Sequence, residues 1–244
     1  MYTHHKFDHA FPEGTEPRIV YWVCSTPRSG SSLLCELLCN TGLAGAPTEY
    51  FDREQMEGFA RAWSCDGFES YLRALLAKKT SPNGVFGAKI HWGQKLDLFT
   101  DRALDDALPD AQFIWITRRD RVKQAVSWER ANQTGQWASD HVASNRRPVF
   151  DYDRIASALE EIERGDEAWA NLFSEQGITP HRVVYEDLIR NRESVIRGVL
   201  AALGIDLPSG FQIPEPTLRR QADWRSRLWA WRFRRRKCSI EPSG

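Results

Sequence analysis

The stretch 19–34, with the sequence IVYWVCSTPRSGSSLL, decides the fold class. Its first seven residues, 19–25, form a continuous apolar run rich in β-forming side chains, as expected of a strand buried on both faces of a sheet. Residues 26–30 are typical of a tight turn, and residues 31–39 of a helix that stops near Gly42. A buried strand, a turn and a helix in this order predict an α/β fold.

The turn after this strand has the composition of an anion-binding loop. Gly30 allows the backbone to approach an anion closely. The start of the following helix offers free N–H groups and a partial positive charge. Ser31 and Ser32 add hydroxyl donors, and Arg28 adds a permanent charge. We therefore predict a phosphate site built from Arg28, Ser29, Gly30, Ser31 and Ser32; the alternative is a Ser/Gly turn that only caps the helix.

The rest of the chain alternates strands and helices. Further strands are expected at 85–90, 113–117 and 182–185, and helices at 122–131, 153–175 and 191–203. The polar or mixed segments 52–83 and 132–150 are expected to hold substrate-facing loops and short helices. The pattern predicts a three-layer, P-loop-like α/β fold, with a central, mainly parallel sheet of about five strands flanked by helices. We expect one domain over 18–244, after a flexible N-terminal segment, 1–17.

Composition excludes several classes of protein. The 244 residues contain 33 basic and 33 acidic side chains, so the net charge is zero, unlike that of a uniformly basic nucleic-acid-binding protein. No apolar window is long enough for a transmembrane helix, and the N-terminus lacks the apolar core of a signal peptide. Five cysteines without a CxxC motif indicate reduced thiols and predict a cytoplasmic protein. Cys35 and Cys39 have no further ligand nearby, so no metal site is predicted.

The loop differs from a nucleoside-triphosphate loop. A Walker A motif places Lys directly after its second Gly, but Ser31 stands at that position here. The cation instead precedes Gly30 by two residues, at Arg28. Three functions remain open on this basis: a sulfotransferase, a small-molecule kinase with an atypical P-loop, or a non-catalytic anion-binding protein.

Five motifs, in order along most of the chain, resemble the bacterial carbohydrate sulfotransferases typified by trehalose 2-sulfotransferase. They are 28–34 (RSGSSLL), 41–51 (TGLAGAPTEYF), 82–92 (PNGVFGAKIHW), 118–127 (RRDRVKQAVS) and 220–226 (RQADWRS). The resemblance implies that the sulfuryl group of 3′-phosphoadenylyl sulfate (PAPS) moves to a hydroxyl of a carbohydrate-like acceptor, trehalose or a related glycoside. It also implies that PAP is released, that no metal is required, and that a homodimer forms.

The resemblance assigns residues to the donor. Arg28, with the amides of 29–32, would hold the 5′-phosphosulfate and neutralise charge on the bridging oxygen. Ser127 and an arginine after the strand 113–117 would hold the 3′-phosphate. Similarity to the trehalose enzyme favours Arg118 for this role, whereas the family's usual spacing of eight residues to Ser127 favours Arg119. The alternative is that these arginines belong to a solvent-exposed, arginine-rich loop with no ligand. Gln221 lies in a segment that would close over the nucleotide.

The resemblance also assigns residues to the acceptor. Glu49 matches the carboxylate that takes the proton of the reacting hydroxyl, although a capping or salt-bridge role is the alternative. Lys89 would steady the sulfuryl oxygens, or pair with Glu49 and tune its pKa. His91 is a rival base of lower rank. Stacking faces for a sugar are offered by Trp63, Trp92, Trp128 and Trp137.

The C-terminal segment near 218–237 concentrates positive charge. It holds nine Lys or Arg and one Asp, a net charge of +8, so the rest of the chain carries −8. Trp224, Leu228 and Trp231 follow helical spacing, and Trp229 and Phe233 form a neighbouring pair. The pattern predicts an amphipathic helix that packs against the core or a second subunit. Contact with an anionic membrane surface is a weaker alternative, and nucleic acid is not predicted as a partner because no recognition motif accompanies the charge.

Overall fold

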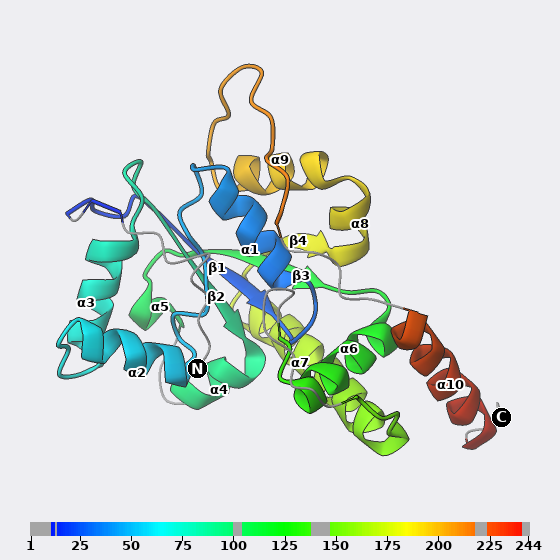
Figure 1. The fold of residues 1–244 in the computed structure, drawn as a ribbon. Helices are drawn as coiled ribbons and strands as arrows, with labels where there is room; N and C mark the ends of the chain where they lie inside the picture. Colours follow the sequence, from blue (N-terminus) through cyan, green and yellow to red (C-terminus); the bar gives the residue numbers. More distant parts are fainter. Residues whose placement is uncertain (1–10, 13, 100–103, 138–146, 218–223, 241–244) are drawn as a thin grey trace.

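A four-stranded parallel sheet forms the centre of the part of the chain that the structure, a computed structural model, describes (Figure 1). The described residues are 11–12, 14–99, 104–137, 147–217 and 224–240. The strands are β1 (Ile19–Ser25), β2 (Val85–His91), β3 (Gln112–Thr117) and β4 (His181–Val184), in the order β2-β1-β3-β4. Each neighbouring pair is parallel. The predicted α/β fold is confirmed, but about five strands were expected and the described residues form four.

Beside β2, on the side away from β1, the chain makes a single isolated bridge. Thr48 makes one parallel bridge to Ala88, and the Lys89 N–H donates to the Thr48 carbonyl at 2.8 Å. The chain then turns away at once, because the Asp52 N–H donates to the Glu49 carbonyl at 2.9 Å. Glu49 is thereby held at the carboxyl edge of β2, where the functional site forms.

The two faces of β1 bury alternate side chains, which explains its unbroken apolar sequence. Tyr21 and Val23 face one cluster and Trp22 and Cys24 the other, and each is 0% exposed. The first cluster is covered by α1 (Ser31–Asn40), α8 (Tyr185–Arg190) and α9 (Arg192–Ala202). The second is covered by α2 (Arg53–Ala62), α3 (Phe68–Lys79), α4 (Trp92–Leu98), α5 (Leu104–Ala107) and α7 (Tyr152–Glu175). The result is the predicted three layers.

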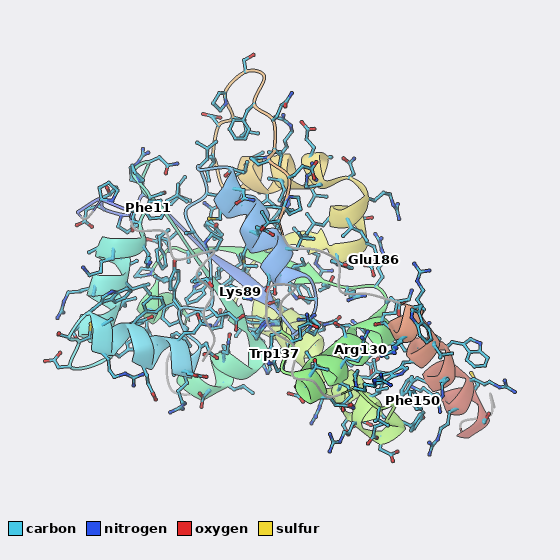
Figure 2. All side chains as sticks on the ribbon, in the orientation of Figure 1. Phe11, Lys89, Arg130, Trp137, Phe150 and Glu186 are labelled. Carbon is cyan, nitrogen blue, oxygen red and sulfur yellow. The ribbon has the colours of Figure 1, made fainter. Side chains whose placement is uncertain are left out.

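A third cluster joins α6 (Arg121–Thr134) and α7 to α10 (Trp224–Ile240), which lies beside them at the edge of the molecule (Figure 1). Trp229, Ala230 and Phe233 form the inner face of α10. Next to this face, Arg232 lies over the ring of Phe150, which Figure 2 labels, and Arg236 lies over the ring of Tyr152. Among the helices that the structure describes, none has the length and apolar composition needed to cross a membrane.

The apolar face of α10 differs from the spacing expected from the sequence. Trp224, Leu228 and Trp231 are 67%, 41% and 54% exposed, so they point away from the inner cluster. The neighbouring pair, Trp229 and Phe233, is buried instead. Helical spacing identifies two apolar faces on this helix, and only contact with α6 and α7 decides which one is covered.

Candidate active site

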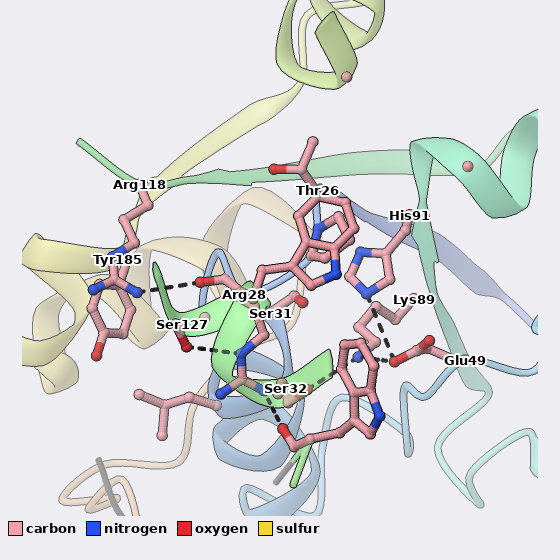
Figure 3. Close-up of a pocket in the computed structure, with 18 of the residues that line it drawn as sticks. Thr26, Arg28, Ser31, Ser32, Glu49, Lys89, His91, Arg118, Ser127 and Tyr185 are labelled. Atoms are coloured by element: carbon pink, nitrogen blue, oxygen red, sulfur yellow. Dashed lines mark hydrogen bonds and ion pairs between the residues drawn. The ribbon is translucent and has the colours of Figure 1, made fainter. Parts of the chain in front are cut away.

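A cleft of about 1580 Å³ opens at the carboxyl ends of the strands, where ligands bind in open parallel sheets. Its lining includes the segments that follow the strands, the end of β2, and residues from the helices around them. Figure 3 shows side chains from these segments pointing toward one another, and among those that line the cleft are Thr26, Arg28, Ser31, Ser32, Glu49, Lys89, His91, Arg118, Ser127 and Tyr185. The cleft therefore gathers residues that are distant in sequence around the loop between β1 and α1.

The loop between β1 and α1 passes close to the end of β4. Gly30 has a φ of +99°, and a Cβ there would lie 2.4 Å from Cδ2 of Tyr185, so a glycine is required on both counts. Ser31 and Ser32 begin α1 and line the cleft, which places the N-terminus of this helix at its floor. The geometry suits a bound anion because the first N–H groups of a helix have no intrahelical partner.

Side chains of α6 and α7 form hydrogen bonds that hold the end of β1 and the loop after it in place. The Thr26 hydroxyl donates to the buried Asp166 carboxylate at 3.1 Å, and the Gln124 amide donates to Thr26 at 3.0 Å and to the Pro27 carbonyl at 2.8 Å. The Trp169 indole donates to the Ser25 carbonyl at 3.0 Å. The sequence interpretation missed these supports, because nothing local indicates that residues 97 to 144 positions away face the loop.

Arg28 and Arg118 meet at one end of the cleft. Arg28 Nε donates to the Ser127 hydroxyl at 3.0 Å, and its Nη1 donates to the Trp137 carbonyl. Arg118 Nη1 donates to the Arg28 carbonyl at 3.3 Å, and its guanidinium lies 4.6 Å from the centre of the Tyr185 ring. Both arginines and Ser127 therefore line one continuous cationic wall.

Arg118 and Arg119 face opposite ways. Arg118 is 9% exposed and lines the cleft. Arg119 makes a bidentate pair with Asp187, at 3.0 and 2.5 Å, with its side chain 55% exposed on the outer surface. Successive residues at a strand end point in opposite directions, so the structure brings Arg118, and not Arg119, beside Arg28 and Ser127.

Glu49 and Lys89 form a buried ion pair at the other end of the cleft. Their closest atoms, Oε1 and Nζ, are 2.5 Å apart, and Lys89 also donates to the Ser32 hydroxyl at 3.1 Å. Burial alone would raise the pKa of Glu49, but the nearby Lys89, His91 and Gln94 outweigh it and hold that pKa well below its ordinary value. Lys89 therefore connects the carboxylate to the anion loop (Figure 3).

His91 lies between Ser25 and Glu49 as a neutral imidazole. Its Nδ1 is 2.9 Å from the Ser25 hydroxyl, and its Nε2 is 3.8 Å from Glu49 Oε1. Burial lowers the pKa of His91 to about 4, although the charge of Glu49 acts in the opposite direction. Gln94, on α4, donates to Glu49 Oε2 at 2.7 Å and is a neighbour that sequence reasoning did not find.

The sequence of this chain matches a known protein family. The sequence model of the Stf0 sulphotransferases matches residues 20–236, most of the chain. The chain belongs to the Stf0 sulphotransferase family. The predicted sulfotransferase is confirmed, and the alternatives of a kinase and of a non-catalytic anion-binding protein lose their support.

Two relatives of this Stf0 sulphotransferase carry the name trehalose 2-sulfotransferase. The protein of Mycolicibacterium smegmatis is 35% identical, over 88% of this chain and 94% of its own length. The protein of Mycobacterium tuberculosis is 32% identical over the same shares of the two chains. The similarity therefore extends across most of the chain.

Solved structures share the fold at low sequence identity. Sulfotransferase STF9 from Mycobacterium avium has a TM-score of 0.54 and 13% identity, covering 95% of this chain and 70% of that one. A sulfotransferase from Alicyclobacillus acidocaldarius has a TM-score of 0.52 and 16% identity, covering 92% and 95%. The architecture of this Stf0 sulphotransferase is thus that of other sulfotransferases.

Some residues predicted for the site lie elsewhere. Ser29 is fully buried, its N–H donates to the Thr26 carbonyl at 3.3 Å, and its side chain does not line the cleft. Of the four tryptophans considered for sugar stacking, Trp63 stacks on Phe59 away from the cleft, whereas the other three line it. Gln221 lies outside the described residues, as do residues 1–10 and 13 of the segment expected to be flexible.

The cysteines of this Stf0 sulphotransferase are free thiols. Burial raises the pKa of Cys35 to about 12 and that of Cys39 to about 11, so both stay protonated near neutral pH. Within the described residues, no group of three or more His, Cys, Asp or Glu side chains is arranged to hold a metal ion.

Proposed function

We propose that this sulfotransferase moves the sulfuryl group of PAPS to a hydroxyl of a carbohydrate-like acceptor, with trehalose or a related glycoside as the first candidate. The names of the two relatives support this acceptor. The observation that carries the proposal is the junction at Lys89, which contacts both Ser32 of the anion loop and the carboxylate of Glu49. A donor phosphosulfate at the loop would therefore meet an acceptor hydroxyl at the carboxylate.

The donor set fits a molecule with two anionic ends. Arg28, with Ser31, Ser32 and the first amides of α1, is suited to the 5′-phosphosulfate, because a guanidinium and a helix N-terminus both favour anions. Arg118 and Ser127 are suited to the 3′-phosphate. The backbone of Ser29 and the side chain of Gln221 would complete the nucleotide contacts. These cationic groups neutralise the donor's charge themselves, so we propose no metal requirement.

The proposed reaction is an in-line displacement at sulfur. The acceptor oxygen forms a bond to sulfur as the bond from sulfur to the bridging phosphate oxygen breaks, and PAP leaves with that electron pair. The transition state is loose, so catalysis consists mainly of positioning and charge stabilisation. Arg28 would stabilise the negative charge that grows on the leaving oxygen, and Glu49 would take the proton of the acceptor hydroxyl.

Lys89 would link donor binding to the basicity of Glu49. The ion pair lowers the pKa of Glu49, and an ionised carboxylate held in this way is a weak base. A sulfuryl group bound beside Ser32 would offer Lys89 a second anionic partner and draw it away from Glu49. The pKa of Glu49 would then rise, so the base would strengthen when the donor is in place.

Binding of PAP tests the donor site directly. Excess PAP should raise the melting temperature, because a ligand at 100 times its Kd stabilises the folded state by about 2.7 kcal/mol. Arg28→Ala should lose most of this shift. Arg119→Ala is the matched control, since Arg119 points outward, and it should keep the shift. A parent enzyme whose melting temperature does not change at saturating PAP would contradict the donor proposal. The acceptor is tested separately, by incubating the enzyme with PAPS and trehalose and looking for sulfated trehalose by mass spectrometry.

We also propose a homodimer formed through α10. Three large apolar side chains, Trp224, Leu228 and Trp231, are exposed on one helix. Exposed apolar patches of this kind mark interaction sites. The helix is basic, whereas the chain outside 218–237 carries a net charge of −8, so a second copy offers the complementary charge.

A cytoplasmic location and a single domain over 18–244 complete the proposal. Five free thiols fit a reducing compartment, in which disulfides are rare. The clusters on the two faces of the sheet share β1 and β3, which supports treating the strands and helices as one folding unit.

A further inference from the structure

Two carboxylates line the acceptor end of the cleft and share one amide. Gln94 Nε2 donates to Glu49 Oε2 at 2.7 Å and to Asp52 Oδ2 at 3.3 Å. The two carboxylate oxygens therefore lie within about 6 Å of each other. Asp52 and Gln94 both line the cleft, on the side where Glu49 faces the proposed acceptor. The pair thus extends the site beyond the reacting hydroxyl.

Hydrogen bonds to the backbone fix the direction of both new side chains. Gln94 Oε1 accepts from the His91 N–H at 2.9 Å, at the start of α4, so the amide nitrogen must turn toward the carboxylates. Asp52 Oδ1 accepts from the Gln55 N–H at 3.2 Å as the N-cap of α2, which leaves Oδ2 toward Gln94 and the cleft. The starts of α2 and α4 therefore fix the orientation of the Asp52 and Gln94 side chains.

The carboxylate oxygens of Glu49 and Asp52 can accept further hydrogen bonds, and hydroxyl groups of an acceptor are suitable donors. An ionised carboxylate only accepts hydrogen bonds, and each of its oxygens has two lone pairs. Asp52 Oδ2 receives the Gln94 amide through a long bond of 3.3 Å and retains room for another donor from the cleft. Hydroxyls on adjacent carbons of a sugar ring are close enough for one to reach each carboxylate.

We propose that Glu49 and Asp52 together bind two adjacent hydroxyls of the acceptor, Glu49 the one that is sulfated and Asp52 its neighbour. Gln94 is the positioning residue that holds the two carboxylates at their spacing. The inference rests on the proposed function of Glu49. It makes Asp52 a specificity-determining residue, which selects a vicinal diol of a sugar over an isolated alcohol.

A deoxy acceptor tests the contact between Asp52 and the neighbouring hydroxyl. The acceptor is compared with its analogues that lack one hydroxyl next to the sulfated position, using the parent and Asp52→Asn. Asparagine keeps the N-cap and the size of Asp52. With the parent enzyme, one deoxy analogue should lower kcat/KM about 10- to 100-fold, as expected for a lost hydrogen bond to a charged group. With Asp52→Asn the same analogue should lose much less, and an equal loss in both enzymes would overturn the proposal.

A charge change tests the positioning role of Gln94. Gln94→Glu keeps an oxygen for the His91 N–H but replaces the amide donor by a third negative charge. Lys89 and His91 face Glu49 from β2, Asp52 faces it from the start of α2, and the protonated Cys35 lies beyond on α1. The added charge should raise the pKa of Glu49, so the acidic limb of the kcat/KM profile should move to higher pH. A profile identical to that of the parent would remove Gln94 from this role.

Two controls separate this inference from the function on which it rests. Asp52→Asn and Gln94→Glu should bind PAP as the parent does, because neither residue touches the anion loop. If PAP fails to stabilise the parent, or Glu49→Gln retains full turnover, the proposed function itself is wrong. If both behave as expected while the deoxy penalty is independent of Asp52, only the diol subsite is wrong.

Discussion

At the scale of single residues, the proposed mechanism depends most on Glu49 as the general base. Its carboxylate contacts Lys89 and Gln94, so it is held on both oxygens before any acceptor arrives. Glu49→Gln should leave PAP binding unchanged and lower the rate of sulfation about 10²-fold or more, the magnitude typical of a general base. Sulfation rates and PAP titration on the same preparation provide the measurement. Full turnover in this variant would exclude Glu49 as the base.

In the proposed mechanism, Lys89 sets the pH range in which Glu49 can act as the base. The ion pair holds the pKa of Glu49 below its usual range, so removal of the positive charge should raise that pKa. In Lys89→Met the acidic limb of the pH–rate profile should therefore move to higher pH, together with a loss of rate. Lys95→Met is a suitable control, because Lys95 lies over the ring of Trp92 rather than beside Glu49. An unmoved limb in Lys89→Met would contradict the assigned coupling.

His91 makes the fold sensitive to acid. Its pKa falls from 6.5 to about 4 on burial, so between these values the unfolded chain binds the proton and the folded chain does not. The free energy of unfolding should therefore decrease as the pH falls from about 6.5 to about 4. Denaturant unfolding at several pH values should record this slope, and His91→Asn should flatten it. Part of the slope should persist in His91→Asn because burial also lowers the pKa of His181.

At the scale of elements, the loop between β1 and α1 depends on one glycine. Gly30→Ala places a methyl group 2.4 Å from Tyr185 in a left-handed conformation. Backbone strain should cost about 1–3 kcal/mol and overpacking a similar amount, and the PAP-induced thermal shift should be lost. Gly42→Ala is the matched control, with a φ of +68° but nothing within 4 Å, so only the strain applies. Equal losses of stability in the two variants would show that the contact with Tyr185 has no energetic role.

At the scale of the whole molecule, the proposed homodimer depends on the exposed apolar side chains of α10. Trp224→Ser combined with Trp231→Ser should shift a dimer toward monomer in sedimentation experiments, because both side chains lie on the exposed face. Added salt should weaken the dimer, since charge complementarity is part of the contact. Val149→Ser, which removes another exposed apolar side chain, should leave the dimer intact. A monomeric parent enzyme would exclude this interface.

Local sequence was sufficient for the framework of the fold and for part of the site. The apolar run 19–25 predicted the central strand, because a strand buried on both faces must be apolar at every position. The loop around Gly30 was recognisable because turn geometry and anion binding are set by a few adjacent residues. The five motifs, read as a family resemblance, led to Arg28, Glu49 and Lys89 and to the sulfotransferase function.

Only the tertiary structure decided which side chains meet. Adjacent arginines look alike in sequence, yet Arg118 lines the cleft and Arg119 lies outside it. The contact of Lys89 with both Ser32 and Glu49, and the amide of Gln94 between two carboxylates, join residues from separate elements. The buried face of α10 also depends on its neighbours. Local patterns record what each segment can form, whereas burial and pairing depend on contacts between segments far apart in the chain, and those contacts exist only after folding.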